Sequence, residues 1–200
     1  MGTRVYFEYA PPEGLSTLIL QHLDLFMIWL ENLCIEYPNE FSEDISRFAK
    51  QVERDGVAAL QATTSEQAAL VDDFVMEFFG NFAENHSITT PANGNRVSIQ
   101  HYWDCKSWLA VHCSPAFERL WMFMLEGRGI ERDSEQLPFT QALDPVCRIG
   151  YWTVQECVTM LHELQPLTIP EAKPTFCVRI VRDALQTVVD QQASMLIFVN

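Results

Sequence analysis

The chain has 200 residues, of which 48% are hydrophobic and 20% are charged. A globular chain of this length buries roughly 70% of its unfolded surface, so neither disulfides nor a structural metal is needed to hold its core. Its 27 acidic and 13 basic residues give a net charge of −14, which excludes a nucleic-acid-binding surface of the usual basic kind.

The acidic residues are concentrated early in the chain. Residues 1–100 carry 15 acids and 5 bases, and the segment from Glu36 to Glu84 alone holds 11 acids and 3 bases. We expect this density of negative charge to attract a basic protein partner. Solvated helix faces that keep the protein in solution are the alternative explanation.

The first elements are a strand and a long apolar helix. Residues 3–9 are rich in β-forming side chains and end at two prolines, which predicts a strand and a turn. From Leu15 to Leu33 apolar residues recur at helical spacing, and others such as Ile28 make the segment apolar on nearly every side. We expect one central helix covered by the others. Asp24 argues against a membrane span, because placing its carboxylate in a bilayer costs about 3 kcal/mol.

Two acidic helices are expected next. Ser42 is the predicted N-cap of a helix that ends near Leu60, and Thr64 with Gln67 is a predicted capping box for the following helix. Carboxylates outside the apolar stripes of these helices form the expected acidic partner surface, namely Glu43, Asp44, Asp72, Asp73 and Glu77.

A loop, a strand and a helix are expected in the middle of the chain. Residues 86–96 include the pair Asn93–Gly94, which is typical of an exposed loop. Residues 97–103 are rich in β-forming side chains and predict a second strand. Ser114–Pro115 supplies an N-cap and a first-turn proline for a helix that Gly127 closes.

The last third of the chain predicts two strands and two helices. Residues 148–152 form a short β-rich run, and Thr153 with Glu156 is a predicted capping box for the helix that follows. Residues 177–191 predict a final helix. The apolar residues 194–199 predict a strand inside a sheet.

Together these elements predict an α+β fold. We expect a single globular domain over residues 1–200, with a small mixed β-sheet flanked by about six helices. The chain does not open on a secretory signal pattern, so we expect a cytoplasmic protein whose six cysteines are reduced. We expect no cofactor, no metal site and no membrane or nucleic-acid partner, and the sequence leaves the oligomeric state open.

Three segments carry a family resemblance. Asp104, Lys106, Trp108 and His112 resemble a D-K-x-W-x-x-x-H helix, with Cys105 as an extra residue after the aspartate. Residues 150–153 with Glu156 and Val158 resemble a strand followed by a capped helix, and residues 195–199 resemble a terminal strand. Over residues 104–112, 148–164 and 194–199 the chain resembles the YfbM-like family of uncharacterised bacterial proteins, a domain of unknown function. The resemblance implies an α+β architecture and no particular activity.

The helix expected to begin at Asp104 carries the main candidate binding residues. Trp108 and His112 lie one turn apart on it, and His101, Asp104 and Arg148 are further candidates. In this hypothesis His112 is a base or a ligand contact in a cleft lined by Trp108. A core histidine bonded to the backbone is the alternative. Asp104 and His112 would stand about 12 Å apart along the helix, too far to share one metal ion.

Other chemistry is less well supported by the sequence. His101 and Cys105, with Cys113 or Cys147, are a weaker candidate for a zinc site. No phosphate loop, dinucleotide fingerprint, nucleophile elbow or His-Glu-x-x-His helix occurs, so we assign no catalytic residue. We therefore expect a non-catalytic, immunity-like or adaptor protein that docks a basic protein partner. The alternative is a small-molecule-binding protein or modest hydrolase built around Trp108 and His112.

Overall fold

The computed structural model describes residues 4–36, 38, 42–79, 88–130, 136, 139, 148–172 and 175–199. The fold is α+β, as predicted. Packing divides the chain into two compact units. The sheet unit consists of residues 1–12, 89–128 and 144–200, and the helical unit consists of residues 13–88 and 129–143. A single domain over residues 1–200 stays a prediction.

The sheet unit contains four strands in the order β2-β1-β4-β3. They are β1 (Arg4–Ala10), β2 (Thr90–Ser98), β3 (Arg148–Trp152) and β4 (Ser194–Val199). Every pairing in this sheet is antiparallel, so the expected mixed sheet is wrong in that respect, because strand direction depends on tertiary connections that sequence patterns do not contain. β4 lies between β1 and β3 and is buried at every position, which confirms the predicted interior strand.

Strand β2 covers residues that the sequence assigned to a loop. The expected loop, residues 86–96, is wrong from Thr90 onward because this part pairs with β1, while its first two residues lie outside the described residues. The register between β1 and β2 shifts between Tyr6 and Glu8. The Asn93–Gly94 turn signal falls in this irregularity, so it is accommodated by a bulge inside the strand pairing.

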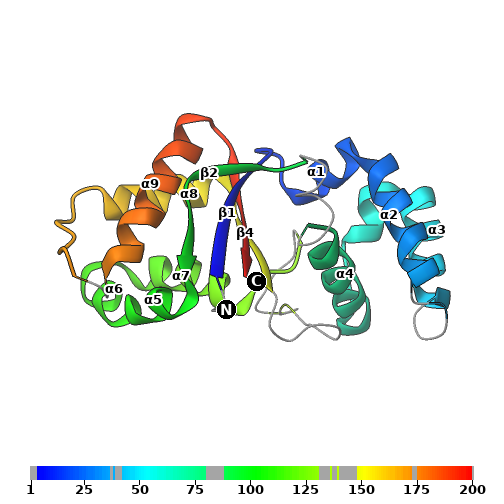
Figure 1. Ribbon diagram of the computed structural model, residues 1–200, viewed down its shortest axis with the longest axis horizontal. Coiled ribbons are helices and arrows are strands. Elements are labelled where there is room, and N and C mark those ends of the chain that lie inside the picture. Colours follow the sequence, from blue (N-terminus) through cyan, green and yellow to red (C-terminus); the bar gives the residue numbers. More distant parts are fainter. Residues whose placement is uncertain are drawn as a thin grey trace. The chain divides into compact units, whose positions relative to one another are not determined.

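The helices of the sheet unit lie on one side of the sheet (Figure 1). They are α5 (Ile99–Asp104), α6 (Lys106–His112), α7 (Pro115–Glu126), α8 (Val154–Leu164) and α9 (Phe176–Asp190). Their core includes Phe7 and Ile197 from the sheet, with the buried indoles of Trp121 and Trp152. Alternate strand residues therefore face these helices, as the two-residue period of a strand requires.

The strand predicted for residues 97–103 is confirmed only at Val97 and Ser98, which belong to β2, and helix α5 replaces it from Ile99 onward. Tyr102 is buried, its hydroxyl donates to the Trp121 carbonyl oxygen at 2.6 Å, and its ring stacks on the Trp121 ring at a centroid distance of 4.0 Å. Aromatic residues that favour strands are here held in a helix by core packing. Asp104 consequently ends α5, and its expected role as the N-cap of the helix that carries Trp108 is wrong.

The predicted ends of α7 and α8 are confirmed. Ser114 caps the first turn of α7, Pro115 opens it, and Gly127 ends it with a φ of 80°. Thr153 and Glu156 form a reciprocal capping box at the start of α8. Local side-chain chemistry is enough to set these boundaries.

The helical unit has an aromatic core. Its elements are α1 (Leu15–Gln21), α2 (Leu23–Glu36), α3 (Ser42–Asp55), the 3-10 helix η1 (Gly56–Leu60) and α4 (Ser65–Glu77). Phe26 packs edge-on to Phe78 at 4.9 Å, and Phe48 lies 5.0 Å from Phe74, between ring centroids. These contacts link α2, α3 and α4.

The single central helix expected from Leu15 to Leu33 is wrong. The chain breaks between α1 and α2, whose axes differ by 87°. Ile28 is 48% exposed, so α2 is not covered on every side. None of the described helices is by itself long and apolar enough to cross a membrane, whereas the bent pair α1 and α2 passes the same test of length and composition together.

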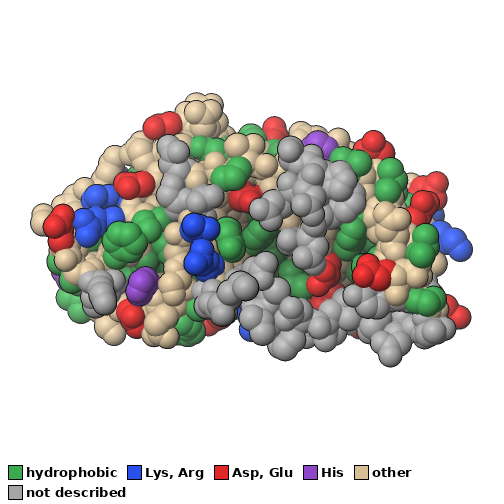
Figure 2. All heavy atoms as spheres, in the orientation of Figure 1, with side chains coloured by type: hydrophobic (Ala, Val, Ile, Leu, Met, Phe, Trp, Pro, Cys, Tyr) green, Lys and Arg blue, Asp and Glu red, His purple; other side chains and the backbone are tan. Residues whose placement is uncertain are grey.

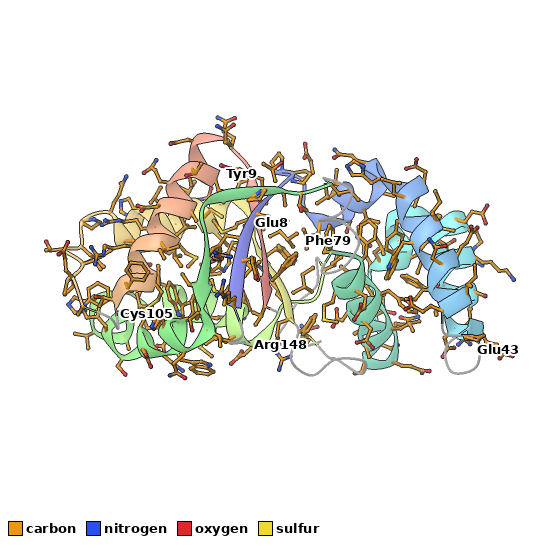
Figure 3. The ribbon with its side chains drawn as sticks, viewed as in Figure 1. Glu8, Tyr9, Glu43, Phe79, Cys105 and Arg148 are labelled. Atoms are coloured by element: carbon orange, nitrogen blue, oxygen red, sulfur yellow. A yellow bond between two sulfur atoms is a disulfide. The ribbon has the colours of Figure 1, made fainter. Side chains whose placement is uncertain are left out.

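A disulfide joins Cys105, between α5 and α6, to Cys177 at the start of α9 (Figure 3). The two residues are 72 positions apart in the sequence. The expectation of six reduced cysteines is wrong for this pair, because tertiary packing brings α5 against α9 and no local motif records that contact. Cys147 lies outside the described residues.

Candidate functional site

His112 is exposed at the end of α6. Its ring stacks on that of Trp108, with a centroid distance of 4.2 Å and an interplanar angle of 18°. Its Nδ1 lies 2.8 Å from the Trp108 carbonyl oxygen. Because a carbonyl oxygen can only accept, the neutral imidazole carries its proton on Nδ1 and leaves Nε2 as an acceptor. Because His112 is exposed, the alternative of a core histidine is wrong about burial, although the backbone hydrogen bond that it expected is present.

The other candidate binding residues lie elsewhere in the sheet unit. Asp104 is exposed and accepts from Gln100 Nε2 at 2.9 Å, and His101 is half-buried one turn earlier on α5. Arg148 is half-buried at the start of β3, and Figure 3 shows it well apart from Cys105 at the junction of α5 and α6. A single cleft that unites all these candidates stays a prediction.

The surroundings of two free cysteines disfavour thiol chemistry. Burial, together with the Glu163 carboxylate, raises the pKa of Cys113 to about 11. Burial, together with the Glu156 carboxylate, raises the pKa of Cys157 to about 12. Both thiols are therefore protonated at neutral pH, whereas a nucleophilic cysteine needs a lowered pKa.

The described part of the chain holds no group of three or more His, Cys, Asp or Glu side chains that could bind a metal ion. In the zinc alternative, Cys105 was to act with His101 and with Cys113 or Cys147. Cys105 is instead bonded to Cys177, which removes its thiolate from such a site.

Two of the expected surface acids are buried. Asp72 and Asp73 are 1% and 5% exposed, so their assignment to an acidic partner surface is wrong. All positions of α4 from Val71 to Met76 are buried. A residue can therefore lie off the apolar stripe of this helix and still be covered, because the later part of α4 is buried at six consecutive positions.

The remaining three acids lie on a surface of mixed charge. Glu43 is exposed near the start of α3 (Figure 3), and Glu77 is half-buried at the end of α4. Asp44 is half-buried and forms an ion pair with Arg47. The sequence pattern suggested an acidic surface on α3, but the surface of this helix carries both negative and positive side chains.

The exposed side of α2 combines acidic and apolar side chains. Asp24, Ile28, Glu31 and Ile35 recur at the three- and four-residue spacing of one helix face, and all four are exposed. Ile35 is 77% exposed, and α2 contains no lysine or arginine. We call these four residues the α2 face. In Figure 2, acidic and hydrophobic side chains lie next to one another in this region.

The sequence pattern did not reveal the α2 face because its isoleucines were counted with the core. The available signal was the spacing of Asp24 and Glu31, which are seven residues apart and so lie on one side of the helix. Charged residues on one side of an apolar helix mark the side that faces solvent. Phe26, Trp29 and Leu30 mark the buried side.

Grooves border α3 on more than one side. The first, of about 730 Å³, is lined by six residues of that helix and is called the α3 groove: Glu43, Ser46, Arg47, Lys50, Gln51 and Arg54. The second, of about 430 Å³, runs between α3 and α4, with Leu70 and Phe74 among its lining residues. The groove between α3 and α4 could not be predicted from the sequence, because sequence patterns do not record which helices pack side by side.

No protein-family model matches this chain, and neither a curated protein nor a solved structure does. The resemblance to the YfbM-like family, carried by residues 104–112, 148–164 and 194–199, therefore stays a prediction.

Proposed function

We propose that this protein is a non-catalytic binding protein, of the immunity or adaptor kind, that docks a basic protein partner through the α2 face. The observation that carries the proposal is the composition of that face. Two exposed carboxylates alternate along it with two exposed isoleucines, and no base occurs in α2. Single exposed apolar side chains are normal on a protein surface, and the support for the proposal is that two of them share one helix face with two carboxylates.

The isoleucines supply the short-range part of the binding energy. Fully burying an exposed isoleucine is worth about 1.5–3 kcal/mol, so Ile35, which is 77% exposed, contributes more than Ile28, which is 48% exposed. The charges supply the long-range part. A net charge of −14 attracts a basic partner during encounter, and Asp24 and Glu31 set its register on the helix.

The chemistry of the α2 face defines the partner segment that fits it. Apolar side chains at helical spacing, flanked by lysine or arginine, match both components of the face, as in helix-in-groove recognition. Charge reversal at Glu31 should therefore weaken binding through the association rate. Truncation of Ile35 should weaken it through the dissociation rate.

A second function is favoured by the stacked pair Trp108 and His112. Its exposed imidazole keeps Nε2 as an acceptor beside a flat indole, an arrangement that suits a small ligand with an N–H or O–H donor. This supports the alternative of a small-molecule-binding protein or modest hydrolase. The α2 face ranks above it because it combines two kinds of complementarity in one continuous surface.

A cytoplasmic location stays part of the proposal. The disulfide between Cys105 and Cys177 weighs against it, because reducing compartments keep most thiols unpaired. Counting free thiols by mass spectrometry after rapid alkylation of intact cells decides the matter. A bonded pair in the cell contradicts a reducing location.

The test of the proposed function is affinity capture from the native lysate with a matched pair of double variants. Glu31→Lys with Ile35→Ser alters the α2 face. Glu53→Lys with Val111→Ser alters an exposed acid and an equally exposed apolar residue elsewhere. Circular dichroism checks that both variants are folded.

We expect wild type and control to retain the same basic protein at about 50 mM salt and to release it at about 500 mM, where charges are screened within a few ångströms. The α2-face variant should retain none of it. A partner that is not basic, or one that both variants retain equally, contradicts the proposal.

A further inference from the structure

The three basic residues between Glu36 and Glu84 lie on one side of α3. Between Glu36 and Glu84 there are 11 acids and 3 bases, and these bases are Arg47, Lys50 and Arg54. All three are exposed, and all three line the α3 groove. Their spacing of three and four residues sets them in one row along the helix. In this acidic segment, the three positive charges therefore line one open surface groove.

Charge pairs within α3 explain part of this row, because Arg47 follows Glu43 and Asp44 by four and three residues and Lys50 precedes Glu53 by three. Arg54 lies in the last turn, where a cation interacts favourably with the helix dipole, but Arg47 and Lys50 lie in the middle of the helix. Lys50 has Arg47 on one side of the row and Arg54 on the other. Like charges at this spacing destabilise a helix, and a bound anion would relieve their repulsion.

The present ion pairs of these arginines are readily exchanged. Arg47 pairs with Asp44, and Arg54 donates from Nε and Nη2 to Asp55 at 2.7 and 2.6 Å. Exposed pairs of this kind contribute little to stability, and a phosphate accepts from a guanidinium in the same bidentate geometry. Within the described part of the chain, Lys50 forms no ion pair.

We propose that the α3 groove binds a small polyphosphate anion. The groove holds about 730 Å³, and its described lining carries three positive charges and one negative charge, that of Glu43. Arg47 and Arg54 are separated by about 10 Å of helix, which matches an anion with several charged groups in a row. Ser46 and Gln51 add a hydroxyl and an amide that can donate to phosphate oxygens.

The same lining distinguishes a polyphosphate from a nucleotide. The described lining residues of the α3 groove include no aromatic side chain, so none of them stacks on a nucleobase. The site is therefore expected to bind tripolyphosphate at least as tightly as ATP. This inference does not depend on the basic protein partner, since the α2 face and the α3 groove share no residue.

The test is isothermal titration calorimetry of the intact protein with sodium tripolyphosphate at about 50 mM salt, where surface charges are only partly screened. Lys50→Glu removes the central cation of the row, and Lys106→Glu is the matched control, because it makes the same charge change on α6. A second variant, Arg47→Gln with Arg54→Gln, keeps Lys50 and removes both guanidinium groups. Circular dichroism verifies that each variant is folded.

We expect saturable binding to wild type, a loss of affinity of at least about tenfold in both α3 variants, and a change of less than about twofold in the control. Absence of saturable binding to wild type overturns the proposal. Equal losses in Lys50→Glu and Lys106→Glu also overturn it, because they show a general charge effect. Tighter binding of ATP than of tripolyphosphate refutes the ligand class.

Discussion

Replacing Glu156 by alanine removes the centre of a polar cluster that joins α7, β3 and α8. One carboxylate oxygen of Glu156 accepts from the backbone N–H of Thr153 at 2.8 Å, from its hydroxyl at 3.0 Å and from Arg128 Nη1 at 2.7 Å. The Arg128 guanidinium also lies 4.5 Å from the ring centroid of Phe123 and 4.4 Å from that of Tyr151. Loss of this carboxylate therefore removes part of the N-terminal cap of α8 and also leaves the Arg128 guanidinium without its ion-pair partner.

The two losses can be estimated separately. Removing a capping interaction costs about 1 kcal/mol. Breaking a fully buried ion pair costs about 3–5 kcal/mol, but the side chains of Arg128 and Glu156 are 15% and 23% exposed, which reduces this to about 1–2 kcal/mol. We expect Glu156→Ala to lower the free energy of unfolding by about 2–3 kcal/mol, and Glu156→Gln, which keeps an acceptor for Thr153, by about 1 kcal/mol.

Chemical denaturation followed by circular dichroism measures these differences. Glu171→Ala is the control, because Glu171 also pairs with an arginine, Arg179, but its side chain is 89% exposed. We expect that control to lose at most about 0.5 kcal/mol. If Glu156→Ala loses no more than Glu171→Ala, the reasoning about burial and capping is refuted.

Three further changes test the core of the sheet unit. Gly150→Ala would place a Cβ 2.8 Å from the backbone oxygen of Phe123, so we expect a loss of about 1–3 kcal/mol in denaturation, and wild-type stability would contradict the close approach. Tyr102→Phe leaves the Trp121 carbonyl oxygen without its 2.6 Å donor and should cost about 1–3 kcal/mol, against a loss near zero if that bond is not formed. Because its pKa is raised from 9.0 to about 11, Cys113 should react with iodoacetamide at pH 8 about a hundredfold more slowly than an ordinary thiol, with a rate that rises toward pH 11; a normal rate at pH 8 would refute the shift.

Elements with local signals were predictable from the sequence. Thr153 with Glu156 marks the start of α8, and Ser114–Pro115 marks that of α7, because each cap depends on contacts within one turn. The capping box predicted for Thr64 and Gln67 at the start of α4 is only half formed. Thr64 accepts from the Gln67 N–H, but the Gln67 side chain accepts from the neighbouring Thr63 instead.

Elements that depend on distant partners were not predictable. Thr90 onward forms a strand because β1 offers it an edge, despite the turn signal of Asn93–Gly94. Tyr102 lies in a helix because its ring and hydroxyl find Trp121. In both cases tertiary contacts outweigh local preference.

The candidate sites, too, were predictable only where residue spacing within one helix determines the contact. The spacing of Trp108 and His112 correctly placed their rings one turn apart and in contact. Burial was not available from spacing, so Asp72 and Asp73 were assigned to a surface although both are buried, and Ile35 was overlooked although it is exposed. Which side of an apolar helix meets solvent is decided by the elements that pack against it.

Site-specific photo-crosslinking tests the central claim most directly. A photoreactive amino acid is placed at position 35 on the α2 face, and in a separate protein at position 111 on α6, where the native residues Ile35 and Val111 are 77% and 78% exposed. Irradiation in the native lysate, followed by mass spectrometry, identifies what each position touches. We predict that position 35 crosslinks one basic protein and that position 111 does not. Crosslinks to that protein from both positions, or from neither, would contradict the account.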